Sequence, residues 1–477
     1  MRPVTSRRTR RFRAPLLMCL AVLIVPSVAS AERAGSSLRA LQAGDLDAGH
    51  KFTCAVVDDG SAWCWGDDAA GGLGNGDPRQ SEPAPVRVLL PQGRRARSIS
   101  AGTFHACAVL DDGAVWCWGL DATGALGDRE PAADRAAPVR AELPLDRRAI
   151  AVSAGSEHTC AVLNDQSAWC WGSDKDGRLG NGGANQNSEV PSQVSLPAGR
   201  GALAVSAGGF HTCAILDDES TWCWGFGAGG ALGNGGTQSQ GTPTQVAFGM
   251  SFIPAHGLSA GNASTCALLR TSQTACWGAN ADGQLGNDGA PQPSLFPSLV
   301  GGNAGSLSGG VAVAAGNHAC WVDPSSVRCW GDDFHGQLGD GLPAVDTSAP
   351  SVVLGIPSTR EVIAITTGGA GNLQTGGGHT CAAYDDGSVI CWGDDAAGQL
   401  GNGPAVTGSI TRPDEGAVAL PAGSVFVFSA DVSLSLQGAP ARLGIGESAP
   451  IVVRVRNGGP DPASELRVSL ASSALDI

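Results

Sequence analysis

A segment of about 53 residues recurs seven times along this chain of 477 residues. One copy, at residues 154–182, reads AGSEHTCAVLNDQSAWCWGSDKDGRLGNG. Aligned on their first cysteine, successive copies are separated by 53, 53, 53, 53, 54 and 61 residues. A repeat at a fixed period of this size predicts a closed or stacked array of one supersecondary unit.

Each copy contains four short apolar stretches and no helical period. In the third copy these stretches are residues 149–154, 158–163, 167–172 and 191–197. They are rich in Val, Trp and Cys and are bounded by Gly, Pro, Asn and Asp, which is typical of strands and turns. Four strands in each of seven copies predict an all-β fold, a seven-bladed β-propeller of four-stranded blades.

The repeated line also resembles a known family. The pattern AG-x-x-H-T-C-A-V-L-x-D-G-x-x-W-x-W-G, followed by G-Q-L-G-N-G, is similar to the repeat of the regulator of chromosome condensation family over residues 38–430. The resemblance implies the same propeller, here in a secreted bacterial member of the family. It does not fix the function, because one fold serves many functions. The G-x-L-G element recurs in phase at residues 71–74, 124–127, 177–180, 230–233, 283–286, 336–339 and 398–401.

The cysteines form local pairs at nearly constant spacing. In the first copy a three-residue loop, Asp58-Asp59-Gly60, places Val57 opposite Ser61 and Cys54 opposite Cys64. If Val57 and Ser61 form a hydrogen-bonded pair, the cysteines occupy a non-hydrogen-bonded pair about 4.5 Å apart, which a disulfide accepts. One disulfide is therefore expected in each blade. The expected pairs are Cys54 with Cys64, Cys107 with Cys117, Cys160 with Cys170, Cys213 with Cys223, Cys266 with Cys276, Cys320 with Cys329, and Cys381 with Cys391.

The hairpin loops differ between copies. Gly60 suits the left-handed position of such a loop, and Gly113 and Gly387 repeat it. Non-glycine residues take this place in three other copies and should adopt a strained positive φ. The sixth copy is one residue shorter and predicts a tighter turn at Pro324-Ser325. The three residues expected to be strained are Gln166, Glu219 and Ser272.

Two other uses of the cysteines fit the spacing poorly. Structural zinc sites use C-x₂₋₄-C, and redox catalysis uses C-x-x-C with a neighbour that stabilises a thiolate. Neither pattern occurs. No metal, cofactor or catalytic residue is therefore assigned.

Histidines and tryptophans recur with the cysteines. A histidine lies two residues before the first cysteine in five copies, and Phe52 and Ser264 replace it in the other two. We expect a structural role, in which each ring bonds loop backbone. Paired tryptophans such as Trp169 and Trp171 share one side of a strand and predict packing between blades. A light-sensing branch of the family carries G-W-R-H-T, whereas residues 155–159 read Gly-Ser-Glu-His-Thr here. The histidines are His105, His158, His211, His318 and His379.

The N-terminus predicts export. Six arginines precede an apolar run at residues 14–28 and then Ala29-Ser30-Ala31, which is typical of a cleaved signal peptide at residues 1–31. Thr9-Arg10-Arg11 also permits a twin-arginine signal, and Cys19 is a weak candidate for acylation. The apolar run is short for a membrane span. An extracellular, periplasmic or cell-surface location is expected.

The mature chain is acidic. Without residues 1–31 it has 24 basic (30 minus 6) and 44 acidic residues, a net charge of about −20. This balance favours solubility and partners with basic surfaces, and it disfavours nucleic acid. Acidic pairs at Asp67-Asp68, Asp332-Asp333 and Asp394-Asp395 precede the G-x-L-G element, where turn formation explains them. Asp174-Lys175-Asp176-Gly177 hints at a calcium loop but lacks its third acidic ligand and its closing glutamate.

The end of the chain has a different composition. A propeller is expected over residues 32–430, with a glycine-rich loop at residues 368–378, a final strand at 417–421 and a strand at 425–429 that pairs across the seam. Residues 431–477 resemble the opening strands of immunoglobulin-like modules of bacterial surface proteins. Since they amount to about half a module, they predict a partial β-sandwich.

These observations favour a secreted, non-enzymatic propeller that acts as a protein-binding scaffold. The family also implies guanine-nucleotide exchange with chromatin association, which export and cysteine content oppose. A third hypothesis is a hydrolase or lyase with its site at the propeller mouth. No Walker loop, G-x-S-x-G or H-E-x-x-H motif occurs to support it.

Overall fold

The computed structural model describes residues 45–418 with several gaps, and two later strands. The predicted signal peptide lies outside the described residues. So do the loop residues Pro324-Ser325, most of the predicted final strand, and the predicted seam strand at 425–429. The gaps are 78–79, 131–132, 184, 250–252, 290–291, 302–306, 308–309, 311, 324–325, 343–344, 370–376, 404–409, 412 and 414–417, and the later strands are 432–437 and 452–457.

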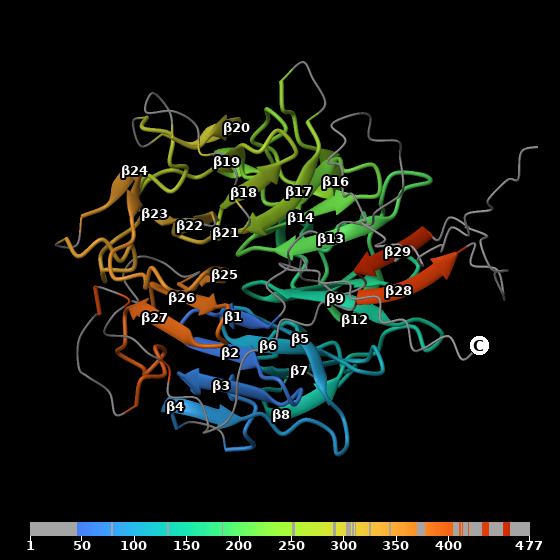
Figure 1. Cartoon of the computed structure of the whole chain (residues 1–477). Helices are drawn as coiled ribbons and strands as arrows, with labels where there is room; N and C mark the ends of the chain where they lie inside the picture. Colours follow the sequence, from blue (N-terminus) through green and yellow to red (C-terminus); the bar gives the residue numbers. More distant parts are fainter. Residues whose placement is uncertain are drawn as a thin grey trace, which may run out of the picture. The chain divides into compact units, whose positions relative to one another are not determined.

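The repeats fold into seven antiparallel sheets, the blades of a propeller (Figure 1). In each of the first six, four strands lie side by side in sequence order. Blades 1 to 3 are β1 (Leu46–Ala48), β2 (Phe52–Val56), β3 (Ala62–Gly66), β4 (Glu82–Arg87); β5 (Ala96–Ala101), β6 (His105–Leu110), β7 (Val115–Gly119), β8 (Arg135–Arg140); β9 (Ala149–Ala154), β10 (His158–Leu163), β11 (Ala168–Gly172), β12 (Ser188–Gln193). Blades 4 to 6 are β13 (Ala202–Ala207), β14 (His211–Leu216), β15 (Thr221–Gly225), β16 (Gln240–Gln245); β17 (Ala255–Ala260), β18 (Ser264–Leu269), β19 (Thr274–Gly278), β20 (Ser294–Leu299); β21 (Ala312–Ala315), β22 (His318–Asp323), β23 (Ser326–Gly331), β24 (Thr347–Val352).

Blade 7 contains β25 (Val362–Thr367), β26 (His379–Tyr384) and β27 (Val389–Gly393). Ile410 bridges Gly393, and the Val418 amide donates to the Val389 carbonyl (3.1 Å), so the chain beyond β27 takes the fourth position. Two short 3₁₀ turns, η1 (Lys175–Gly177) and η2 (Ala228–Gly230), lie in loops, and a separate hairpin is formed by β28 (Val432–Gln437) and β29 (Val452–Asn457). The fold class predicted from the repeat is confirmed.

The third blade shows where the strand prediction succeeds and where it fails. The first three expected stretches match β9, β10 and β11 to within one residue. The fourth prediction, residues 191–197, is wrong, because β12 covers Ser188–Gln193. The polar residues before Val194 form the edge ladder, whereas Val194 leaves the ladder and is buried in the core.

Among the described residues, contacts between the first strands of the blades close the ring. Neighbouring first strands contact one another around the ring, and β25 contacts β1. Ser100 Oγ accepts from the Ala154 amide of the next blade (3.0 Å), and serines of the next two blades repeat this contact at 2.9 Å. In blade 1 the same position is Asp47, which accepts from Ser100 Oγ and from Thr366 Oγ1 of blade 7, both at 2.9 Å. Burial raises the pKa of Asp47 to about 6.

Every blade carries its own disulfide, in the pairing expected from the sequence. Each bond links the second and third strands in register. The Cα atoms lie 4.0–4.1 Å apart, slightly closer than the separation of about 4.5 Å expected for such a pair. The bonds join Cys54 to Cys64, Cys107 to Cys117, Cys160 to Cys170, Cys213 to Cys223, Cys266 to Cys276, Cys320 to Cys329, and Cys381 to Cys391.

The hairpin loops also have the expected geometry. The Val57 amide donates to the Ser61 carbonyl (3.0 Å), which is the closing pair expected from the loop. Gly60 has φ +77°. The residues expected to be strained, Gln166, Glu219 and Ser272, have φ of +66°, +64° and +65°.

The disulfides are core residues as well as crosslinks. All fourteen cysteines are fully buried. Cys54 and Cys64 belong to one apolar cluster with Ala106, Ala108 and Trp118 of the following blade. Each crosslink therefore presents its sulfurs to the neighbouring blade. Among the described residues, no helix has the length and apolar character that crossing a membrane requires.

We expect the oxidised protein to carry no free thiol among these fourteen cysteines. Its mass should lie about 14 Da below that of the fully reduced chain, since seven disulfides remove two hydrogens each. Because the sulfurs are buried between blades, dithiothreitol should reduce them quickly only in denaturant. Mass spectrometry after alkylation measures both effects, and rapid alkylation of the untreated native protein would contradict the assignment.

Candidate interaction face

Antiparallel strands give each blade two different ends. The connections after the first and third strands lie at one end, and those after the second and fourth strands lie at the other. We call these ends the loop face and the hairpin face. The G-x-L-G element and the histidine-bearing turns both belong to connections that start at the loop face.

The G-x-L-G element of each blade contacts the next blade. The Ala125 carbonyl, inside this element of blade 2, accepts from Trp171 Nε1 and Thr159 Oγ1 of blade 3, both at 2.8 Å. Gly127 has φ +72°, and a Cβ there would lie 2.7 Å from Trp171 Nε1. The element thus ends in glycine because an indole packs on it. The contact recurs as Trp65 on Gly401, Trp118 on Gly74, Trp171 on Gly127, Trp224 on Gly180, Trp277 on Gly233, Trp330 on Gly286 and Trp392 on Gly339.

The repeated histidines bond the next blade rather than loop backbone, which corrects the prediction from the sequence. His105 Nε2 lies 2.8 Å from Thr159 Oγ1. Because Thr159 donates to the Ala125 carbonyl, its oxygen is left to accept the Nε2 proton. His379 also bonds backbone, through Nδ1 to the Gly377 carbonyl (2.8 Å). The other pairs are His158–Thr212, His211–Thr265, His318–Thr380 and His379–Thr53, at 2.7–2.8 Å.

The second residue of each acidic pair has a structural role. Its equivalent in blade 2, Asp121, accepts from the Leu126 amide through Oδ1 (2.9 Å) and fixes the turn before the G-x-L-G element. Burial raises the pKa of Asp121 to about 6, and Asn280 performs the same role in blade 5. Turn formation, as expected, explains this position. The pKa is raised to about 6, mainly by burial, at Asp68, Asp121, Asp333 and Asp395.

The segment Asp174-Lys175-Asp176, which resembles part of a calcium-binding loop in sequence, forms the same turn. Asp174 Oδ1 accepts from the Leu179 amide (3.1 Å), and Asp176 adopts φ +64° within η1. In the part of the chain that the structure describes, no cluster of three or more His, Cys, Asp or Glu side chains is arranged to hold a metal ion.

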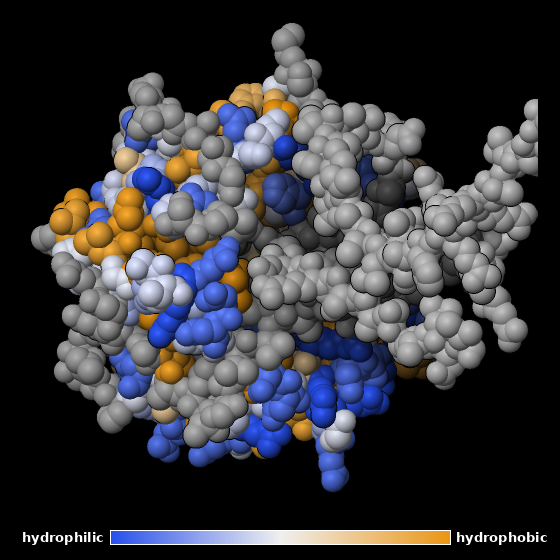
Figure 2. Space-filling model, in the orientation of Figure 1, coloured by the Kyte–Doolittle hydropathy of each residue, from blue (hydrophilic) through white to orange (hydrophobic). Residues whose placement is uncertain are grey.

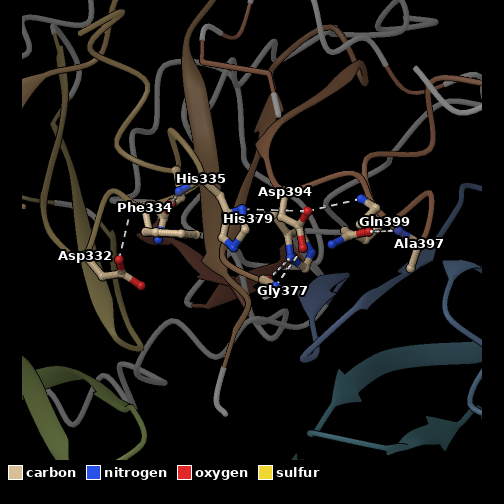
Figure 3. A network of polar contacts seen from close by, with 10 residues as sticks. Asp332, Phe334, His335, Gly377, His379, Asp394, Ala397 and Gln399 are labelled. Atoms are coloured by element: carbon tan, nitrogen blue, oxygen red, sulfur yellow. Dashed lines mark hydrogen bonds and ion pairs between the residues drawn. The ribbon is translucent and has the colours of Figure 1, made fainter. Parts of the chain in front are cut away.

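The first residue of each acidic pair lies on the loop face near the seam. Asp394 Oδ2 accepts from the Gly377 amide (2.7 Å), and Asp394 Oδ1 lies 3.9 Å from His335 Nδ1 (Figure 3). Asp332 Oδ1 accepts from the Phe334 amide (3.0 Å). Gly377 in turn packs against the His50 carbonyl of blade 1, and the charges of Lys51, Asp67 and Asp394 all act on His50. We call Asp67, Asp332, Phe334, His335 and Asp394 the seam arc.

Exposed aromatic side chains also mark the loop face. Phe104 and Phe210, in turns after first strands, keep 40% and 39% of their surface, and Phe334 keeps 70%. Phe210 packs edge-on against Phe226 and lies under the Arg178 guanidinium, 5.6 Å from its carbon. Other repeats carry small, polar or charged residues at these positions, so the fold does not require phenylalanine there.

A second apolar surface lies on the rim of blade 6. Figure 2 shows hydrophobic residues gathered over β24 and its flanking segments, and four of them are exposed: Leu342, Val345, Val352 and Leu354. β24 is the outermost strand of its sheet. A proline occupies the fourth position of this edge strand in all six complete blades, which hinders pairing with another strand. These prolines are Pro85, Pro138, Pro191, Pro243, Pro297 and Pro350.

The structure thus defines a closed propeller of seven homologous blades, each with its own internal disulfide. The chain belongs to the regulator of chromosome condensation family: the family model of the RCC1-like domain matches residues 27–371, and that of the RCC1 repeat matches residues 373–399. The resemblance predicted from the repeated line is confirmed.

Curated relatives cover the propeller to different extents. The ultraviolet-B receptor UVR8 of Arabidopsis thaliana is 29% identical over 298 residues, which are 62% of this chain and 65% of that protein. The E3 ubiquitin-protein ligase HERC2 of Homo sapiens is 27% identical over 370 residues, 76% of this chain and 7% of that protein. The chain therefore spans less than two thirds of either relative. The regulator of chromosome condensation of Mus musculus is 27% identical, over 71% of this chain and 80% of that protein.

Solved structures share the fold at low identity. Prp20p from Saccharomyces cerevisiae, described with its binding to Gsp1p and histones, matches with a TM-score of 0.64 and 18% identity, over 81% of this chain and 89% of that one. Human WBSCR16 matches with a TM-score of 0.64 and 19% identity, over 76% and 95%.

Replacing Gly180 by alanine tests the contact between blades. The new Cβ would lie 2.5 Å from Trp224 Nε1, at φ +68°. We expect a loss of about 3 kcal/mol in the free energy of unfolding, from backbone strain plus overpacking. Gly199→Ala is the control, since Gly199 has φ +75° and open space around it, and it should lose only about 1 kcal/mol. Equal losses in denaturant titrations would show that the indole contact is not responsible.

Asp121→Asn tests the buried carboxylate. With a folded pKa of about 6 and an unfolded value near 3.8, the native state takes up a proton as the pH falls from 7 to 4, so acid stabilises it at this site. The variant lacks this dependence. We therefore expect its Tm relative to wild type to be about 1–3 °C higher at pH 7 than at pH 4.5. The reciprocal Asn280→Asp variant should show the opposite pH trend in calorimetry. If the Tm difference from wild type did not change with pH for either variant, the raised pKa of Asp121 would be contradicted.

Proposed function

We propose that the protein is an exported, non-enzymatic propeller whose loop face binds a protein partner. The observation that carries the proposal is the exposure of Phe104, Phe210 and Phe334 on one face of a rigid ring. Exposed aromatic residues set on a scaffold are enriched at protein interfaces. The relatives named above include proteins described with protein partners.

Export is supported from two directions. The N-terminal sequence has the pattern of a signal peptide. Disulfides in all seven blades suit an oxidising compartment, because cytosolic thiols are kept reduced. The same two features oppose an intracellular exchange factor, the alternative that the family name suggests. A net charge of about −20 after removal of residues 1–31 also opposes binding to nucleic acid.

Affinity capture tests the loop face. The mature protein, immobilised, is exposed to the medium and envelope of the organism that produces it. We expect it to retain a protein that the Phe104→Ala/Phe210→Ala/Phe334→Ala variant retains at one tenth of the wild-type level or less, because burial of these rings supplies much of the affinity. Quantitative mass spectrometry of the eluates measures the loss.

Two matched variants show which face is responsible. Leu145→Ser removes a large apolar side chain that is 89% exposed on the hairpin face, and Leu342→Ser/Leu354→Ser alters the rim of blade 6. Both should retain the partner at the wild-type level. Loss only in the rim variant would move the interaction to that surface and contradict the loop-face proposal.

A further inference from the structure

We propose that the seam arc anchors an arginine-containing or lysine-containing segment of the protein partner. The proposal rests on the loop-face function and gives that partner a chemistry. A cationic side chain would lie over Phe334 and His335 and be held by the carboxylates of Asp332, Asp394 and Asp67.

The carboxylates of the arc differ from those of the hairpin face in their basic partners. Arg94, Arg147 and Arg200 meet aspartates of the neighbouring hairpin loops at 2.5–3.5 Å. Among the described residues, no lysine or arginine forms an ion pair with the carboxylates of the arc, although Lys51 lies on the same face. The three carboxylates of the arc outnumber the nearby Lys51, whose charge acts on His50 together with those of Asp67 and Asp394, so this sector of the loop face keeps a net negative charge.

The negative charge of Asp332 is unfavourable because the carboxylate is buried. Asp332 keeps only 8% of its surface. Burial raises the pKa of Asp332, and the charge of Asp346 adds to the effect. The Phe334 amide, His335 and Gln337 offset this effect only in part. Burying a carboxylate is unfavourable, and a cation brought by a partner would relieve the remaining penalty. The burial penalty is relieved only when the partner is bound, so its relief favours the complex.

Comparison of the seven repeats shows that the fold does not require an acidic residue at the position of Asp67, Asp332 and Asp394. The residue after the final glycine of the third strand is acidic only in blades 6, 7 and 1, which are consecutive around the closed ring. Blades 2 to 5 form the same turn with other residues. They carry Leu120, Ser173, Phe226 and Ala279. The carboxylates are therefore not required for the turn.

Phe334 is a second residue of the seam arc that differs from its counterparts in the other repeats. Five other repeats carry alanine there, and the third carries Lys175. The Phe334 ring packs edge-on against the His335 ring, with centroids 4.9 Å apart, and most of its surface remains exposed. An aromatic face beside carboxylates binds guanidinium and ammonium groups by cation–π attraction. The ring also contributes apolar contact that a small metal ion could not use.

Fluorescence anisotropy with a labelled octa-arginine peptide tests the proposal on the full mature chain. The test variant is Phe334→Ala/Asp332→Ser/Asp67→Ser, whose residues are borrowed from other repeats so that the turns still form. Asp394 is kept because it holds the Gly377 amide. At physiological salt we expect the Kd to rise at least tenfold, about 1.4 kcal/mol. Phe334→Ala alone should weaken octa-arginine more than octa-lysine, since guanidinium stacks better on a ring.

The control is Asp58→Asn/Asp146→Asn, which removes the same two charges from exposed positions of the hairpin face. It should change the Kd less than twofold. Equal weakening by both variants would show binding to overall charge only and overturn the proposal, as would wild-type affinity in the test variant. If the captured partner depends on Phe104 and Phe210 but not on the arc, the loop-face function stands and the arc proposal fails.

Discussion

The packing of each second tryptophan on a glycine of the preceding blade is the contact on which the ring depends. The blades are separate sheets, and no hydrogen-bonded ladder joins one to the next among the described strands. The blades associate through side-chain packing and through single backbone hydrogen bonds, such as the one from the Gly76 amide to the Ala136 carbonyl (2.8 Å). The tryptophans are the largest of the fully buried side chains. Trp171 fills the space that a side chain at Gly127 would need, and its N–H reaches the Ala125 carbonyl at 2.8 Å. A single methyl group at any of these glycines would disturb one of seven joints.

The disulfides support this arrangement from within each blade. A chain with 70 glycines loses much conformational entropy on folding, and its β-hairpins are weakly stable alone. Each crosslink fixes one hairpin and, by constraining the unfolded chain, stabilises the fold by about 2–3 kcal/mol. Because the sulfurs pack against alanine and tryptophan of the next blade, the crosslinks also contribute apolar surface to the joint. The same bond serves the blade and the ring.

The sequence predicts local features of this protein better than contacts between repeats. Strand positions, the disulfide register and the positive φ at Gln166 follow from spacing within one hairpin. The fourth strand is mispredicted because its edge ladder is polar and its apolar Val194 lies beyond it. The hydrogen-bond partner of the histidine is not predicted because His105 and Thr159 are 54 residues apart and meet only when the blades pack together.

A signal for the histidine contact nevertheless exists in the sequence. Histidine is absent from this position in blades 1 and 5, where Phe52 and Ser264 stand, and threonine is absent from the blade that follows each. The missing threonines are replaced by Ala106 and Ala319. The two losses are coupled because a buried hydroxyl or imidazole without its partner is costly. A change that maintains the fold is matched by a compensating change one repeat later.

This coupling gives a criterion for the residues of the loop face. Phe334 replaces an alanine that suffices in five other blades, and it gains no buried contact that would offset the exposure of its ring. Asp332 replaces residues that form the same turn without a buried charge. Neither departure is compensated by a described neighbour, in contrast to Phe52 with Ala106. Residues that differ from the other repeats without being required or compensated by the fold are best explained by binding to a partner. On the loop face such residues occur together at the seam.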